Sequence, residues 1–244
     1  MQQRPRCQTG IEELDRQMYG GIPVGHTFLI TGSAGTGKTT LAMEYLFNGA
    51  RKGEKGIFFT TIESLPKIKK HLNNYEFFDE KLIDEGKISI IDTWMISDRL
   101  GLDSESYSIE DAYLLFDVLT SIAKELGAKR LVIDSITALC YRLQTNEMIR
   151  DFIFKLSTSL AAINCTTALT SEIPPLSFTY SRYDIEEFIS DGIIFLGDFE
   201  RRGDLIRTLQ VIKMRGILHN RMKMAMNLSS QRGVELSPLL KSMH

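Results

Sequence analysis

The chain of 244 residues lacks a long apolar run. No stretch approaches the ~18 consecutive apolar residues that a membrane-spanning helix needs, and the first seven residues carry no apolar signal core. Basic residues are not in excess either, since 29 Lys and Arg face 31 Asp and Glu, for a net charge of −2. Composition therefore gives no general sign of a nucleic-acid binder, and we expect a soluble cytoplasmic protein without a membrane segment.

Cysteine is scarce and shows no metal-binding pattern. The three residues Cys7, Cys140 and Cys165 are odd in number and have no CxxC spacing, which predicts reduced thiols, with Cys140 and Cys165 in the core. The sequence also lacks internal repeats, low-complexity tracts and a clear linker. With 43% hydrophobic and 25% charged residues, it predicts a single globular domain over residues 1–244.

One complete motif is present. Residues 32–39 read Gly-Ser-Ala-Gly-Thr-Gly-Lys-Thr, which matches the phosphate-binding pattern GxxxxGK[ST]. An apolar run precedes it at 26–31 and a helical stretch follows at 40–47, which is the strand–loop–helix context that the motif requires. Glycines allow the backbone amides to turn toward phosphates, and the helix start adds positive potential. The residues predicted to bind a nucleoside triphosphate here are Gly32, Ser33, Ala34, Gly35, Thr36, Gly37, Lys38, Thr39 and Thr40.

Short apolar runs alternate with amphipathic stretches, which predicts an α/β fold with a mostly parallel central sheet flanked by helices. Strands are expected at 26–31, 56–62, 88–92, 130–134 and 165–171, and helices at 38–52, 65–74, 109–126 and 144–163. After about residue 190 the pattern changes to three strand-like runs, 192–197, 205–213 and 222–228, separated by polar turns. These runs predict antiparallel strands at the edge of the sheet.

A hydrolase of this kind needs a carboxylate near the metal ion and a group that aligns the attacking water. The run Arg130–Asp134 is an apolar strand that ends in aspartate, so Asp134 is predicted to hold Mg²⁺ together with the Thr39 hydroxyl. Glu63 follows the strand at 56–62 and is the candidate general base, provided that this strand neighbours the phosphate loop. Glu172, at the end of a later strand, is the competing candidate.

Two segments have loop composition. Residues 97–108 are polar, and residues 173–184 combine two prolines with three aromatics and one arginine. The second segment has two interpretations. Its aromatics could stack on nucleic-acid bases, or they could fold back onto the domain, and the second interpretation is favoured because such loops are common.

At this point the chain resembles the KaiC branch of the RecA-like ATPases. The resemblance begins at Thr9–Asp15, Gly20–Pro23 and the phosphate loop, and continues through Leu131–Asp134, Ile185–Gly192 and Ile212–His219. These motifs are collinear over nearly the whole chain. Its length matches one such domain, as in stand-alone archaeal members. The resemblance implies a RecA-like core, ATP and Mg²⁺ as ligands, and a six-membered ring with ATP between adjacent subunits.

The resemblance also implies residues that act across the subunit interface. Lys213 and Arg215 match the family's Lys-x-Arg pair that reaches a neighbour's phosphates, and His219 matches a position near that neighbour's nucleotide. Where clock members of the family have two adjacent glutamates, this chain has Ile62 and then Glu63. Acidic Glu186-Glu187 stands in the region of an autophosphorylated pair, so autokinase activity is not expected, and contacts from 227–233 are not carried over.

Three functions follow as alternatives. The first is a slow Mg²⁺-dependent ATPase that forms a ring and uses its nucleotide state to regulate an unknown partner protein. The second is a RecA- or RadA-like recombination mediator that binds single-stranded DNA, and the third is a nucleotide-sensing scaffold with little turnover, suggested by Ile62. The sequence does not choose between a ring and a filament.

Overall fold

The computed structural model describes residues 5–61, 63–93, 95–96, 109–141, 143–175 and 179–239. Within these residues the strands are β1 (Arg6–Cys7), β2 (Ile22–Pro23), β3 (Thr27–Gly32), β4 (Gly56–Thr60), β5 (Ile88–Asp92), β6 (Arg130–Asp134), β7 (Thr166–Glu172), β8 (Gly192–Arg201), β9 (Asp204–Met214), β10 (Met224–Ser229) and β11 (Gly233–Pro238). The helices are α1 (Glu12–Gln17), α2 (Lys38–Arg51), α3 (Leu65–Leu72), α4 (Glu80–Asp84), α6 (Ile109–Leu126), α7 (Ile136–Cys140), α8 (Asn146–Ala162) and α9 (Glu186–Ile189).

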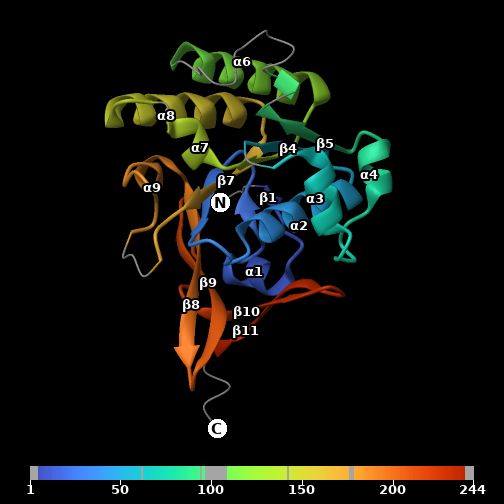
Figure 1. Ribbon diagram of the computed structural model, residues 1–244, viewed down its shortest axis with the longest axis vertical. Coiled ribbons are helices and arrows are strands. Elements are labelled where there is room, and N and C mark those ends of the chain that lie inside the picture. Colours follow the sequence, from blue (N-terminus) through green and yellow to red (C-terminus); the bar gives the residue numbers. More distant parts are fainter. Residues whose placement is uncertain are drawn as a thin grey trace.

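A large central sheet organises the protein, with described strands in the order β11-β10-β9-β8-β3-β7-β6-β4-β5 (Figure 1). The strands from β8 to β5 in that order are parallel to their neighbours. Central parallel strands are buried on both faces, which explains the apolar sequences of β3, β4 and β6. The α/β fold with a mostly parallel sheet is therefore confirmed.

The two faces of the parallel sheet carry separate cores. Phe28, Ile30 and Phe58 lie in one core with the apolar residues of α1, α2 and α3, whereas Leu29 and Phe59 lie in the other with those of α6, α7 and α8. Figure 1 shows the same division, with α6 and α8 on the opposite side of the sheet from α2. Alternation of side chains along each strand sends neighbouring residues to opposite faces, so both cores form from the same short runs.

The C-terminal strands form the predicted antiparallel edge. β9 pairs antiparallel with β8, β10 with β9, and β11 with β10. In Figure 1 these orange and red strands extend beyond the helical layers. The fourth strand, β11, was not predicted. Its sequence alternates buried Val234 with polar Glu235, which is the period of two expected for a half-buried strand.

Most predicted elements agree with the structure to within a few residues. The strand expected at 56–62 ends at Thr60, and the helix expected at 65–74 ends at Leu72. The short elements β1, α1, β2, α4, α7 and α9 were not predicted, because a few residues give too little periodicity. Cys140 and Cys165 are buried as predicted, and Cys7 is buried as well. The loop expected at 97–108 lies outside the described residues, as does Ile62.

Across the described ranges, no helix combines the length and apolar character needed to cross a bilayer.

Candidate functional site

The phosphate loop leaves the carboxyl end of β3 and leads directly into α2. Gly35 and Gly37 have φ angles of +80° and +97°, a left-handed conformation that favours glycine, and Gly37 stands immediately before the helix. The Thr36 side chain is buried and its hydroxyl donates to the Ser33 carbonyl at 2.8 Å. The loop thus has the fixed backbone turn, followed by a 14-residue helix, that can present amides to an anion.

Lys38 folds back over this loop. Its Nζ donates to the carbonyls of Gly32 at 2.9 Å and Ser33 at 2.8 Å. Burial lowers the pKa of Lys38, while the nearby carboxylates of Glu172 and Asp134 act in the opposite direction. The two carbonyls hold the ammonium at the mouth of the loop, where it can meet the charge of a bound phosphate.

Asp134 lies at the carboxyl end of β6 and faces the start of α2. Its Oδ2 accepts a 2.7 Å hydrogen bond from the Thr39 hydroxyl, and its Oδ1 accepts one of 2.5 Å from Thr170 on β7. Both carboxylate oxygens are therefore oriented by neighbouring elements. A hydroxyl and a carboxylate oxygen side by side are the hard ligands that Mg²⁺ prefers, so this pair fits the ion.

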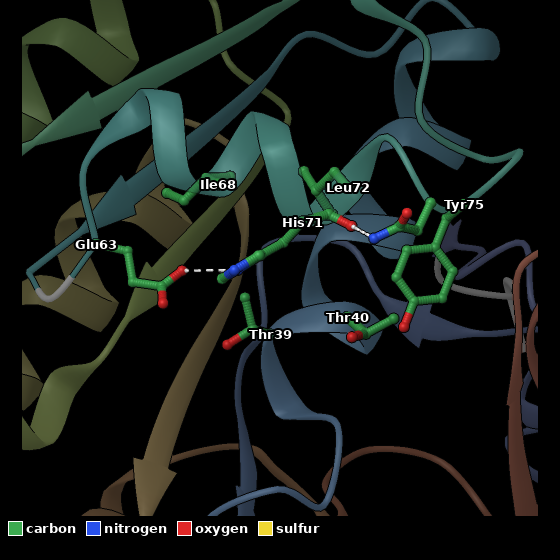
Figure 2. Close-up of a pocket in the computed structure, with 8 residues that line it drawn as sticks. Thr39, Thr40, Glu63, Ile68, His71, Leu72 and Tyr75 are labelled. Atoms are coloured by element: carbon green, nitrogen blue, oxygen red, sulfur yellow. Dashed lines mark hydrogen bonds and ion pairs between the residues drawn. The ribbon is translucent and has the colours of Figure 1, made fainter.

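Three cavities meet at the beginning of α2. One of 350 Å³ is lined by the phosphate loop, Lys38, Asp134 and Glu172, and one of 130 Å³ joins Thr39, Glu63 and Asp134. The third, of 380 Å³, extends from Thr39 and Thr40 toward α3 and Tyr75. Figure 2 shows it, with Glu63 and His71 above the two threonines of α2. The arrangement has room for a phosphate chain at the loop and for a larger group beyond Thr40.

Both candidate general bases reach this site. Glu172 ends β7, where it is the register partner of Gly32, and Glu63 follows β4. The assumption that the strand before Glu63 neighbours the phosphate-loop strand is wrong, because β6 and β7 lie between β4 and β3. Glu63 still comes close, since it shares a cavity with Asp134. The backbone N–H of Glu63 donates to the Thr60 hydroxyl at 3.1 Å, which fixes the turn that carries it.

Comparison with known proteins agrees with this geometry. A family model described as "ATPase: KaiC" matches residues 7–241. The chain belongs to the KaiC family of ATPases. It is 34% identical to a UPF0273 protein of Thermotoga maritima, with 88% of this chain and 89% of that protein aligned. It is 32% identical to the circadian clock oscillator protein KaiC of Parathermosynechococcus lividus, over 96% of this chain but only 43% of that protein, so it spans less than half of the clock protein's length.

A solved structure supports the same assignment. The crystal structure of a KaiC-like protein from Pyrococcus horikoshii OT3 superimposes with a TM-score of 0.82 at 34% identity, covering 97% of this chain and all of that one. The RecA-like fold that the KaiC resemblance implied is thereby confirmed. Membership in this family of ATPases also implies nucleotide binding.

One further basic residue, which was not predicted from the sequence, lies beside the phosphate loop of this KaiC domain. Arg207 lies on β9, and its Nε donates to the Gly35 carbonyl at 3.1 Å. Arg207 pairs in register with Asp198, near the far end of β8, which brings it to the same edge of the sheet as the phosphate loop. No local signal marks this arginine, because its position depends on the register of two antiparallel strands.

Lys213 and Arg215 lie at the other edge of the KaiC sheet. Lys213 pairs with Ile193 at the start of β8, and the Arg215 backbone N–H donates to the carbonyl of Asp191. Ile193 lies level with Leu29 of β3, and Asp191 lies level with Thr27. The phosphate loop follows Gly32, so it is about 10 Å farther along the sheet from Lys213 and about 16 Å from Arg215. The structure therefore does not bring this pair to its own chain's phosphate loop.

The side chains of this pair contact α9 instead. Lys213 Nζ donates to the carbonyls of Glu187 and Ser190 at 2.8 and 2.7 Å, and Arg215 donates to that of Phe188 at 2.8 Å. Burial lowers the pKa of Lys213, with a further contribution from the Arg215 charge. Cations at the carbonyl end of a helix are electrostatically favourable, so the pair stabilises α9 within the subunit.

His219 lies beyond β9, separate from the phosphate loop. Its Nδ1 is buried and has no hydrogen-bond partner among the described residues, and the next residue, Asn220, donates its backbone N–H to the Gln17 carbonyl of α1. The proximity of His219 to a neighbour's nucleotide stays a prediction.

The aromatic loop at 173–184 is described except for residues 176–178. The Tyr180 ring packs edge-on against Phe195 at 5.7 Å, and the Tyr183 hydroxyl donates to the Thr137 carbonyl at 3.0 Å. These two rings are packed against the domain, which favours the structural interpretation of the loop over base stacking. The third aromatic, Phe178, lies outside the described residues.

Proposed function

We propose that this chain is a slow, Mg²⁺-dependent ATPase that assembles as a ring and changes shape or partner binding with its nucleotide state. The observation that carries the proposal is the contact between Thr39 and Asp134, which joins the phosphate-loop helix to β6 at a cavity also lined by Lys38. The phosphate-loop motif, the half-buried Lys38 and two oxygen atoms suited to a metal ion meet at one point. Phosphoryl transfer requires this combination.

Each residue has a proposed role. Loop amides and Lys38 bind the triphosphate, Thr39 and Asp134 hold the metal ion, and Glu63 orients the attacking water. Mg²⁺ would supply positive charge to the phosphate oxygens. The cavity toward Tyr75 would receive the ribose and base, because it opens beyond Thr40 and has aromatic and apolar walls. Arg207 would fix the apex of the loop through the Gly35 carbonyl.

The position of Lys213 and Arg215 supports the proposed ring. Lys213 and Arg215 are about 10 and 16 Å along the sheet from their own phosphate loop, and their side chains contact α9 instead, so the pair would act on phosphates only in an adjacent subunit. Two exposed apolar residues accompany it, Phe188 at 67% and Leu218 at 84% exposure, and such residues are typical of contact surfaces. A hexamer, a contribution from His219 and an unidentified regulatory partner in the cytoplasm belong to this same proposal.

The first test compares Lys38→Ala with Lys52→Ala. Lys52 lies just after the same helix, is exposed and bonds Gln8, so its loss removes one positive charge far from the loop. ATP binding by titration calorimetry is expected to be lost in Lys38→Ala and kept in Lys52→Ala. Solution mass with and without ATP and Mg²⁺, measured together with phosphate release, tests assembly and turnover. Unchanged ATP affinity in Lys38→Ala would rule out the proposed phosphate site.

The two alternatives make different predictions. A nucleotide-sensing scaffold shows little or no multiple-turnover phosphate release, and release that disappears in Glu63→Gln would exclude it. A mediator on single-stranded DNA retains DNA at low salt and loses it steeply as salt is raised. The packing of Tyr180 and Tyr183 against the domain does not favour the second alternative.

A further inference from the structure

Helix α3 stands directly after Glu63 and forms one wall of the site. Ser64 precedes the helix and Pro66 occupies its first turn, a position that proline favours. Ile68 and Leu72 are buried against the core, whereas Lys67 and His71 lie on the outer side with 58% of each side chain exposed. Lys67 and His71 are four residues apart on the helix and therefore lie in one row, and Glu63, in the turn before Ser64, stands at the start of that row.

The nitrogen atoms of Lys67 and His71 both lie near the carboxylate of Glu63. Lys67 Nζ lies 2.9 Å from Oε1 of Glu63, and His71 Nδ1 lies 3.6 Å from Oε2. The Glu63 side chain is 28% exposed, less than half of either partner. Figure 2 shows the Glu63 and His71 side chains directed toward one another above Thr39. Each oxygen of the carboxylate therefore has its own nitrogen neighbour on α3.

From this geometry we infer that Lys67 is a positioning residue for Glu63, with His71 as a second, weaker contact. The inference rests on the proposed function, in which Glu63 orients water. A glutamate side chain has three rotatable bonds, and an ion pair from the next turn restricts them. Lys67 keeps the carboxylate at the 130 Å³ cavity that it shares with Asp134 and Thr39. A small misplacement of such a group reduces turnover without reducing substrate binding.

The proposed effect of Lys67 on turnover can be measured separately from its effect on folding stability. An ion pair with a largely exposed lysine contributes little to folding. Lys67→Gln is therefore expected to fold normally and to bind ATP normally. Lys70 provides the matched control, because it lies on the same helix and is exposed, and among the described residues the ion pairs of Glu63 are with Lys67 and His71.

The experiment measures kcat and KM for ATP hydrolysis by the full chain. We expect Lys67→Gln to lower kcat about fivefold with KM within twofold of the parent. Lys70→Gln should leave both unchanged, and Lys67→Arg should restore most of kcat, since it keeps the charge. In a Glu63→Gln background, Lys67→Gln should have no further effect, because the group it positions is gone.

The outcomes distinguish the positioning role of Lys67 from the proposed function. If Glu63→Gln abolishes turnover but Lys67→Gln leaves kcat unchanged, the positioning role is wrong and the proposed function stands. An equal drop from Lys67→Gln with and without Glu63 shows that the lysine acts independently, which also overturns the inference. If Glu63→Gln hydrolyses ATP normally, the role of Glu63 and the inference fail together.

Discussion

The Thr39 hydroxyl donates a 2.7 Å hydrogen bond to Oδ2 of Asp134, although the two residues are 95 positions apart in the chain. The contact joins the first turn of α2 to the end of β6. Thr170 holds the second carboxylate oxygen at 2.5 Å, so Asp134 has a defined orientation in the proposed metal site.

Replacing Asp134 by Asn tests this relationship. The amide keeps the shape of the side chain and one oxygen but loses the charge that a divalent cation needs. We expect turnover to fall on the order of 100-fold and the Mg²⁺ concentration for half-maximal turnover to rise. A phosphate-release assay over a Mg²⁺ series measures both. Asp117→Asn, at an exposed position of α6, serves as the control, and an unchanged Mg²⁺ dependence in Asp134→Asn would contradict the proposed site.

Mixing two inactive variants tests action between subunits. Lys38→Ala removes the phosphate lysine but keeps Arg215, and Arg215→Ala does the reverse. If Arg215 acts on a neighbour's nucleotide, an equimolar mixture should recover roughly a quarter of the parental rate per site, because half of the subunits keep the loop and half of their neighbours keep the arginine. Phosphate release after mixing without nucleotide and then adding ATP measures the recovery.

The control mixture pairs Arg215→Ala with the double variant Lys38→Ala/Arg215→Ala, in which every subunit lacks the arginine. No recovery is expected there. If the first mixture also stays inactive while native mass measurement shows mixed assemblies, Arg215 does not act across the interface.

Because Glu44 is buried, we expect the free energy of unfolding to depend on pH. The side chain, on α2, is 6% exposed, and its Oε2 accepts the Val234 N–H of β11 at 2.7 Å. Burial raises its pKa from 4.5 to about 7, although the Val234 N–H, Asn48 and Arg51 each act to lower it. Because the pKa is higher in the folded state, the contribution of this group is complete below pH 4.5 and is lost as the pH rises through 7.

Glu44→Gln removes this titration and keeps an oxygen for the Val234 N–H. We expect the variant and the parent to have similar free energies of unfolding near pH 4.5, and the variant to be more stable by about 3 kcal/mol at pH 8. Urea denaturation at a series of pH values measures the difference. Glu76→Gln, at an exposed position, should give a difference that does not change with pH, and the same flat result for Glu44→Gln would contradict the prediction.

The sequence predicted local structure well because its signals are local. The phosphate motif located the start of α2, and the strand–aspartate pattern located Asp134 at a sheet edge. Strand order could not be predicted from such local signals, because it depends on how the crossover connections pack against the sheet. The run before Glu63 therefore gave no indication that β6 and β7 separate β4 from β3.

Side-chain partners across the fold were the least predictable part of the site. The contact of Arg207 with the Gly35 carbonyl depends on the register of β8 and β9, which includes an irregularity at Ile193 and Ile194. By contrast, the contact between Glu63 and Lys67 has a spacing of four that the sequence displays. The structure is still needed to show this contact, because Glu63 precedes α3 and reaches Lys67 from the turn before the helix.

Gly49 provides a last prediction, in which a usual rule is reversed. Alanine in place of glycine inside a helix normally stabilises a protein by ~1 kcal/mol. A Cβ atom at Gly49 of α2 would lie 2.1 Å from Nε of Arg130. Arg130 is fully buried and cannot move easily, because it donates to the Tyr45 and Gln8 carbonyls at 2.6 and 2.8 Å and to Glu54 at 2.6 Å.

We therefore expect Gly49→Ala to lower the free energy of unfolding by about 2 kcal/mol, through the clash and the strained hydrogen bonds of Arg130. Urea denaturation measures the change. In an Arg130→Met background the same substitution should cost little, because the guanidinium that it meets is absent. A stabilised Gly49→Ala protein would show that helix propensity outweighs the contact, and that Arg130 has room to move away from α2.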